Sequence, residues 1–210
     1  MHVLLSSSSS LLLQQGLAES LMGRFELHRF TQSTYQEMKT AFSYSLDDYL
    51  VFGGYPASAA FAQDPLRWVQ YMNDSVIEAT SSRDVIQTES IRNPALMRKL
   101  FILGCQYSAR EVSYRKLLGQ LNDKGNSATI AHYLQLLDSA SLLSGIQKYA
   151  PNALGTRRSS RPPYPRLMLY DTSLMTALSS SVAELLNNPE ERQEQGFAGA
   201  SGIQSALPFG

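Results

Sequence analysis

Residues 93–149 read NPALMRKLFILGCQYSAREVSYRKLLGQLNDKGNSATIAHYLQLLDSASLLSGIQKY, a run of helical patterns that ends in an apolar strand pattern. Asn93-Pro94 predicts the start of a helix, because proline is favoured at the first helical position. We expect a short helix over Ser113–Leu121, a polar turn over Asn122–Asn126 and a further helix over Ser127–Ala140. The core candidates recur at helical spacing, and they are Leu96, Leu100, Ile102, Leu103, Ile130, Leu134 and Leu137.

Two strands complete this unit. We expect them over Leu142–Tyr149 and Arg166–Tyr170, with a loop rich in proline and arginine between them. The order helix, helix, turn, helix, hairpin is typical of a winged helix-turn-helix. The sequence therefore predicts such a domain over residues 93–180.

This domain offers two sets of candidate contacts to DNA or to a partner protein. If it binds duplex DNA, its last helix enters the major groove, and the loop between the strands, which carries no acid, contacts phosphates. The alternatives are an exposed His132 with no role in binding, and a solvated hairpin tip that guards the strand edge. The candidates are Ser127, Thr129, His132 and Gln135 on the helix, and Arg157, Arg158 and Arg161 on the loop.

In the preceding section, residues 33–92, the pattern is helical from Thr34 to Asp84. Thr34–Phe42 carries Glu37 at the capping-box offset from Thr34, and Leu46–Phe52 predicts a second helix that ends at Gly53-Gly54-Tyr55-Pro56. Asp64-Pro65 opens a long helix in the same way as Asn93-Pro94. Its apolar stripe consists of Trp68, Tyr71, Met72, Val76 and Ile77.

The two ends of the chain differ from this middle part. We expect a short strand at residues 2–5, a helix over Leu11–Leu21 and a second strand over Arg24–Phe30. Two strands are too few for an independent sheet, so residues 1–32 look like the last piece of a larger core. Residues 181–210 lose all periodicity after Leu186, and we expect this tail to be disordered.

Composition excludes several classes of protein. The 210 residues carry 18 basic and 18 acidic side chains, so no global field attracts nucleic acid or an anionic membrane. A single cysteine, Cys105, rules out a disulfide scaffold and a thiolate metal cluster, and it reads as a small buried hydrophobe. The histidines are too far apart for an evident metal site. With no membrane-length apolar run and no signal peptide, we expect a soluble, cytoplasmic protein.

No residue pattern in the chain indicates catalysis. Asp47 and Asp48 are adjacent, so on a helix they point in different directions and cannot converge on one site. The segment from Gly119 to Ser127 has lysine and glycine in the wrong order for a phosphate loop. We therefore expect neither catalytic nor metal-binding residues.

Three stretches together resemble one family. They are residues 3–9 continuing to Leu21-Met-Gly-Arg-Phe-Glu26, then Tyr49-Leu-Val-Phe-Gly-Gly-Tyr-Pro56, and a third stretch from Arg83-Asp84 to Asp171-Thr-Ser-Leu174. Their order and spacing are similar to those of the predicted bacterial AAA-type ATPases, in which a winged-helix domain of unknown function follows the ATPase core. The resemblance covers about residues 3–180.

This resemblance implies the roles of individual residues. Ser6, Ser7 and Ser8 match the polar tip of the sensor-one strand, which faces the γ-phosphate of ATP. Gly53, Gly54, Tyr55 and Pro56 match the turn of the helical lid that packs near adenine. Arg24 or Arg83 would be a charge sensor for phosphate, or else a structural ion-pair partner.

The resemblance also implies what the chain would need in order to work. The family binds ATP with magnesium through Walker A and Walker B elements that precede the sensor-one strand, and this sequence contains neither. We therefore expect a mainly α (α+β) fold made of a core remnant (1–32), a helical lid (33–92) and a winged helix (93–180). Such a chain would be part of a nucleotide switch that does not hydrolyse ATP alone and acts with an ATPase core or a partner protein. The alternative is a stand-alone winged-helix module that binds DNA or protein.

Overall fold

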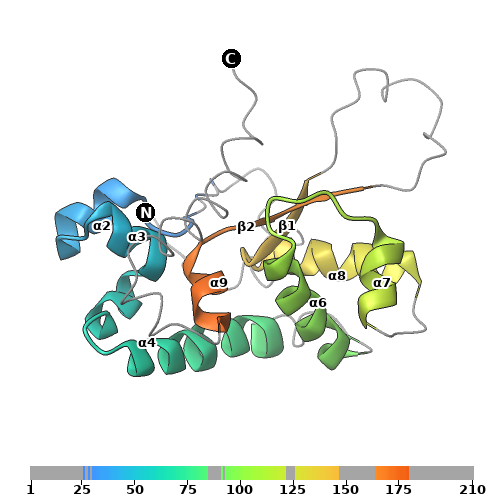
Figure 1. Ribbon diagram of the computed structural model, residues 1–210, viewed down its shortest axis with the longest axis horizontal. Helices are drawn as coiled ribbons and strands as arrows, with labels where there is room; N and C mark the ends of the chain where they lie inside the picture. Colours follow the sequence, from blue (N-terminus) through green and yellow to red (C-terminus); the bar gives the residue numbers. More distant parts are fainter. Residues whose placement is uncertain are drawn as a thin grey trace, which may run out of the picture.

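The computed structural model describes residues 26, 28, 30–84, 91, 93–121, 126–146 and 164–179. This part of the chain is mainly helical, with one two-stranded sheet, which confirms the expected mainly α fold. Figure 1 shows α2 and α3 at one end and α7 and α8 at the other, with α9 between them. No helix in the described ranges has the length and apolar character needed to cross a membrane.

The first two helices begin where their capping residues predict. Helix α2 spans Tyr35–Phe42 and α3 spans Leu46–Phe52. Each has a complete capping box, formed by Thr34 with Glu37 and by Ser45 with Asp48. The Asp48 carboxylate accepts hydrogen bonds from the backbone N–H and the hydroxyl of Ser45.

The long helix expected after Asp64 consists of an α-helix followed directly by a π-helix. The α-helix is α4 (Pro65–Tyr71), and the π-helix is η2 (Met72–Asp84). A short 3-10 helix, η1 (Pro56–Phe61), precedes them. Of the expected stripe, Trp68, Met72 and Ile77 are buried, whereas Tyr71 and Val76 are half-buried. A π-helix bonds residues five apart, which matches the spacing from Met72 to Ile77.

The three helices of the next section follow the predicted order. They are α6 (Pro94–Gln106), α7 (Tyr114–Leu121) and α8 (Ser127–Ser139). Of the core candidates on α6, Leu103 is half-buried and packs against the core, whereas Ile102 is half-buried and is not part of it. Met97 and Phe101 are buried in their place, at 1% and 0% exposure. Together with Leu100 and Gly104, they form a face at the spacing of three and four residues that helices bury.

The expected hairpin is present, and residues 147–149 of its expected first strand lie outside the described residues. Strands β1 (Leu143–Ile146) and β2 (Arg166–Leu169) are antiparallel, and Leu143 pairs with Leu169. The connection between them lies outside the described residues.

The sequence reasoning missed a segment that bonds to the hairpin. Residues 109–112, between α6 and α7, contact the outer edge of β2 through a single bridge between Glu111 and Arg166. Three backbone bonds hold this edge: Ala109 N–H to Leu167 O (2.8 Å), Leu167 N–H to Arg110 O and Val112 N–H to Pro165 O (both 3.1 Å). The edge of β2 that faces away from β1 is therefore bonded to the turn that follows α6.

A continuous core joins the helical section before residue 92 to the section after it. Helix α9 (Ser173–Leu178) follows β2 and contacts α3, α4, η2 and α6. The Asn73 side-chain amide donates to Ala177 O at 3.2 Å, from η2 to α9. Because the buried side chains form one cluster from Met38 to Ala177, the two sections pack as one body.

The amino-terminal expectations lie mostly outside the described residues. The strand expected over Arg24–Phe30 includes Glu26, His28 and Phe30, and the structure places these three in no strand. Phe30 is 94% exposed, so it is not the inward-facing strand residue that the alternating pattern indicated. The elements expected at residues 2–5 and 11–21 and the tail 181–210 are outside the described ranges.

Candidate functional site

The Gly53-Gly54 turn is a buried junction between the two helical sections. Helix α3 ends at Gly53, whose N–H donates to Tyr49 O at 2.8 Å. The N–H of Gly54 donates to Oδ2 of Asp171 at 2.8 Å, across 117 positions in sequence. The turn of the first section is thus bonded to the residue that follows β2 in the second.

Both positions require glycine for a physical reason. Gly53 has φ +70° and ψ −162°, a region that side-chain-bearing residues rarely adopt. A Cβ atom at Gly53 would overlap the carboxylate of Asp171, and one at Gly54 would overlap the carbonyl oxygen of Ser33. The close backbone approach expected of these glycines is an approach to Asp171 and Ser33.

Asp171 is the buried acceptor at the centre of the junction. It is 5% exposed, and its Oδ1 accepts from the N–H of Ser173 at 2.9 Å and from the Ser173 hydroxyl. Burial raises the pKa of Asp171 above its ordinary value, although the bonds from Ser173 and Gly54 oppose the rise. The three donors satisfy a carboxylate that would otherwise be costly to bury.

A short strap before α2 reinforces the same junction. Ser33 donates its N–H to Gly54 O at 2.7 Å and accepts from the Tyr49 hydroxyl at 3.0 Å. The Gln32 side-chain amide donates to the Tyr55 hydroxyl at 2.9 Å and to Ser141 O, between α8 and β1, at 3.2 Å. The strap therefore bonds both to the Gly53-Gly54-Tyr55 turn and to the segment that follows α8.

Two residues of the proposed adenine-facing turn differ in their exposure. Tyr55 is half-buried, and burial raises the pKa of its hydroxyl, which accepts a hydrogen bond from the Gln32 side-chain amide. Pro56 opens η1 and is exposed. Because the N–H groups of Gly53 and Gly54 already have acceptors, this turn has no free glycine amide with which to hold a phosphate.

The outward face of α8 carries the side chains expected there. Ser127, His132 and Gln135 are exposed, whereas Ile130, Leu134 and Leu137 are buried. Thr129 is half-buried, and its N–H and hydroxyl both donate to the Asn126 cap, at 2.8 and 3.1 Å. Of the four candidate contacts, Thr129 is therefore the one engaged in holding the helix start.

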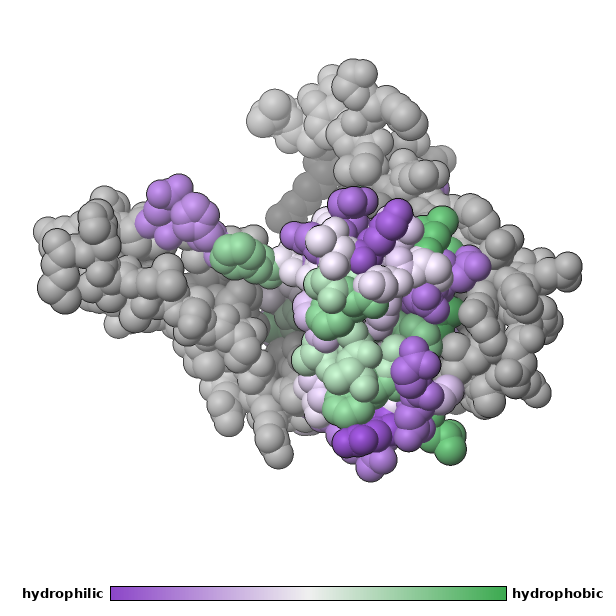
Figure 2. Space-filling model, turned by 90° about the vertical axis from the view of Figure 1, so that its left-hand side faces the viewer, coloured by the Kyte–Doolittle hydropathy of each residue, from purple (hydrophilic) through white to green (hydrophobic). Residues whose placement is uncertain are grey.

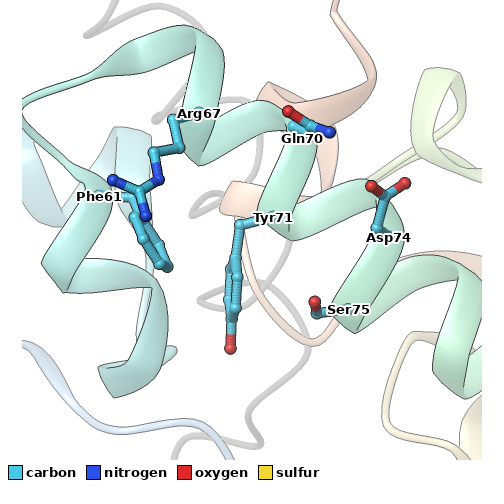
Figure 3. Close-up of a pocket in the computed structure, with 6 residues that line it drawn as sticks. All are labelled: Phe61, Arg67, Gln70, Tyr71, Asp74 and Ser75. Atoms are coloured by element: carbon cyan, nitrogen blue, oxygen red, sulfur yellow. The ribbon is translucent and has the colours of Figure 1, made fainter.

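A shallow hollow of about 220 Å³ lies between η1 and the helices α4 and η2. The Arg67 guanidinium lies 4.7 Å above the ring of Phe61, and the ring of Tyr71 is 4.9 Å from that of Phe61. Figure 3 shows Arg67 against Phe61, with Asp74 and Ser75 farther along the helix. The planar cation of this hollow is thus already placed over an aromatic ring of the protein.

The end of the molecule formed by α2 and α3 has an apolar surface. Figure 2 shows an apolar band on this face between polar areas. Among the exposed apolar side chains of the described residues are Phe42 of α2 (42%), Leu46 of α3 (52%) and Leu66 of α4 (82%). Apolar atoms make up a large share of the surface of any folded protein, so we assign no ligand to this band.

Several predicted site residues lie beyond what the structure describes. They are Ser6, Ser7, Ser8 and Arg24 at the amino end, and Arg157, Arg158 and Arg161 in the loop between β1 and β2. Arg83 lies in η2, where the backbone alone is described.

Cys105 agrees with its prediction as a buried hydrophobe. The side chain is 4% exposed, and burial raises the pKa of its thiol. In the ranges that the structure covers, no three His, Cys, Asp or Glu side chains gather closely enough to hold a metal ion.

Sequence comparison places the chain in a family. The model of the family described as "Domain of unknown function (DUF8612)" matches residues 43–186, so the chain belongs to that family. Neither the curated proteins nor the solved structures contain a significant match to it. The matched segment spans both sides of the Gly54–Asp171 junction, so the family unit includes both partners of this contact.

Proposed function

We propose that this chain is the lid and winged-helix part of an AAA-type, ATP-binding nucleotide switch. The observation that carries the proposal is the buried bond from Gly54 to Asp171 at 2.8 Å. It joins the turn that resembles the lid of such ATPases to the section that resembles their winged helix. A displacement of the lid would then move the winged helix with it, because both belong to one body.

The order of elements supports the winged-helix part of the proposal. Three helices are followed by an antiparallel hairpin, and the segment between the first two helices forms a bridge to the hairpin edge. This order is the one expected of a helix-turn-helix that carries a small sheet as its wing.

The nucleotide part of the proposal rests on the sequence resemblance. Ser6, Ser7, Ser8 and Arg24 would lie near the phosphates, and the exposed Pro56 would lie near adenine. ATP with magnesium would supply the driving force for closure. No phosphate cradle is present among the described residues, since both glycine amides of the turn are bonded within the protein. We therefore expect no magnesium-dependent ATP hydrolysis above a no-enzyme control.

The rigid-body part can be tested by a distance measurement between spin labels. Gln36→Cys on α2 and Ala128→Cys on α8 place labels at two exposed helix positions, while the native Cys105 is buried. We expect a narrow distance distribution in the otherwise unchanged chain, and a broader one when Gly54→Ala disrupts the junction. A Gly119→Ala variant is the matched control, because a Cβ there meets no other atom. A broad distance distribution in both the unchanged chain and the control would refute the proposal that the two sections move as one rigid body.

A second function, binding of duplex DNA by the winged helix alone, is favoured by the distribution of charge. Residues 93–179 contain eleven Lys and Arg against four Asp and Glu, a net charge of +7, although the whole chain is neutral. Residues 1–92 contain six basic and ten acidic side chains. Such local positive charge attracts phosphate backbones.

The DNA-binding alternative has its own test. The measurement is the binding of a random duplex at a series of salt concentrations, for the parent chain and for a variant with Arg157, Arg158 and Arg161 changed to Ala. Weaker binding and a smaller salt slope in the triple variant would support phosphate contacts by the loop. Equal weak binding by both proteins at low salt would end this role for the loop.

A further inference from the structure

The start of α7 carries two positive charges at a position that is unfavourable for helix stability. Ser113 caps the helix by accepting the N–H of Lys116 at 3.1 Å, which places Arg115 and Lys116 in the first turn. That turn contains no acidic residue. The amino end of a helix carries a partial positive charge, so a cation placed there is destabilising, whereas an anion is attracted to it. Arg115 and Lys116 therefore destabilise the start of α7 and concentrate positive charge there.

Four side chains from three segments meet beside this turn. The Lys116 ammonium lies 5.0 Å from the ring centre of Tyr107, at the end of α6. The Gln120 side-chain amide, one turn after Lys116, donates to the Tyr107 hydroxyl at 2.7 Å. Arg110 lies in the bend that follows α6, and its charge acts on Tyr107. The bond from Gln120 and the charges of Lys116 and Arg110 lower the pKa of Tyr107. We call Tyr107, Arg110, Lys116 and Gln120 the α7 cluster.

The positive charge of the α7 cluster is not neutralised within the described structure. The nearest acid in sequence, Glu111, forms an ion pair with Arg166 at 3.4 Å. Among the residues that the structure covers, no carboxylate forms an ion pair with Arg110, Arg115 or Lys116. Arg110, Lys116 and Gln120 are exposed, and Tyr107 is half-buried. The cluster is therefore open to an anion from solution.

We infer that the α7 cluster binds a backbone phosphate of duplex DNA. Lys116 and Arg110 would supply the charge. The Tyr107 hydroxyl, whose oxygen already accepts from Gln120, would donate its own hydrogen to a phosphate oxygen. Helix α7 precedes α8, and in a helix-turn-helix the first helix crosses the DNA backbone while the second enters the groove. The inference rests on the DNA-binding function proposed above and adds a contact that the arginine loop does not provide.

The experiment compares the full-length parent with the Arg110→Gln/Lys116→Gln variant on a random duplex of about 20 base pairs. Binding is measured by fluorescence anisotropy at several salt concentrations. The matched control is Arg67→Gln/Lys39→Gln, which removes one Arg and one Lys charge from α4 and α2, where both cations also lie over aromatic rings. Far-UV circular dichroism and thermal melting establish that each variant is folded.

Loss of this one phosphate contact should lower the slope of log affinity against log salt by about 0.9. We expect binding at moderate salt to weaken by roughly tenfold in the cluster variant, and the slope to be unchanged in the control. Tyr107→Phe removes a hydrogen bond but no charge, so it should weaken binding by about fivefold and leave the slope unchanged.

Three results would overturn the inference. If the parent fails to bind DNA at low salt, both the inference and the DNA-binding function fail. If the parent binds and the cluster variant keeps its slope, the inference fails while the DNA-binding function stands. If the slope of log affinity against log salt falls equally in the cluster variant and in the control, the change is due to net charge alone, and the α7 cluster is not a phosphate contact.

Discussion

Replacing Asp171 by Asn tests whether the junction between the two sections depends on the carboxylate. The substitution keeps the size and shape of the side chain. Asn retains one oxygen, which can still accept from Ser173. Its other end becomes an NH₂ group, which would face the N–H of Gly54, where Asp171 Oδ2 now accepts at 2.8 Å.

The expected loss of stability follows from these contacts. A buried N–H without an acceptor costs about 1–3 kcal/mol, and the bonds from Ser173 become weaker because their acceptor is no longer charged. Removing a buried charge offsets part of this loss, since burial raises the pKa of Asp171. We therefore expect the free energy of unfolding to fall by about 2 kcal/mol, and the Tm to fall by roughly 4–8 °C.

Urea unfolding followed by circular dichroism measures this change. The matched control is Asp47→Asn, the same chemical change at a half-buried position on α3. Its expected effect is below about 0.5 kcal/mol. Hydrogen exchange gives a local readout, because the Gly54 amide should be protected in the parent and exchange faster in Asp171→Asn. A loss equal to that of the control, with Gly54 still protected, would refute the role of the carboxylate.

Three further predictions concern the backbone and the pH dependence. Gly54→Ala should destabilise the chain by more than about 2 kcal/mol, because its Cβ would overlap the Ser33 carbonyl. Gly119→Ala should instead stabilise the chain by about 0.5–1 kcal/mol, because a Cβ there meets no other atom and alanine is favoured over glycine in a helix. Thermal melting of the two variants checks both signs. Ser43, which ends α2 at φ 59°, is in the left-handed region, so Ser43→Gly should raise the stability by about 0.5–1 kcal/mol in urea melts, and a loss would contradict that reasoning. Because the pKa of Asp171 is raised above 3.8, its contribution to stability is fully present below pH 3.8 and is lost as the pH rises through the raised value. The stability difference between the parent and Asp171→Asn should therefore narrow as the pH rises above 3.8, and urea melts in which it widens would show that the pKa of Asp171 is instead lowered.

Several features of the protein could be predicted from local sequence alone. Thr34 with Glu37 and Ser45 with Asp48 mark helix starts, because the bonds of a capping box span only three residues. The buried face of α8 follows from the spacing of Ile130, Leu134 and Leu137. This face leaves His132 and Gln135 exposed, as expected.

The tertiary structure decided which distant groups meet. The Gly53-Gly54 turn and the Asp171-Thr-Ser-Leu174 stretch were each recognisable in the sequence, but Gly54 and Asp171 lie 117 positions apart, and nothing local indicates that they meet. The contact of residues 109–112 with β2 was missed for the same reason, since its backbone bonds depend on β2 being placed beside it. Helix starts and faces are set by neighbours within a turn, whereas the junction and the α7 cluster exist because packing brings separate segments within hydrogen-bonding distance.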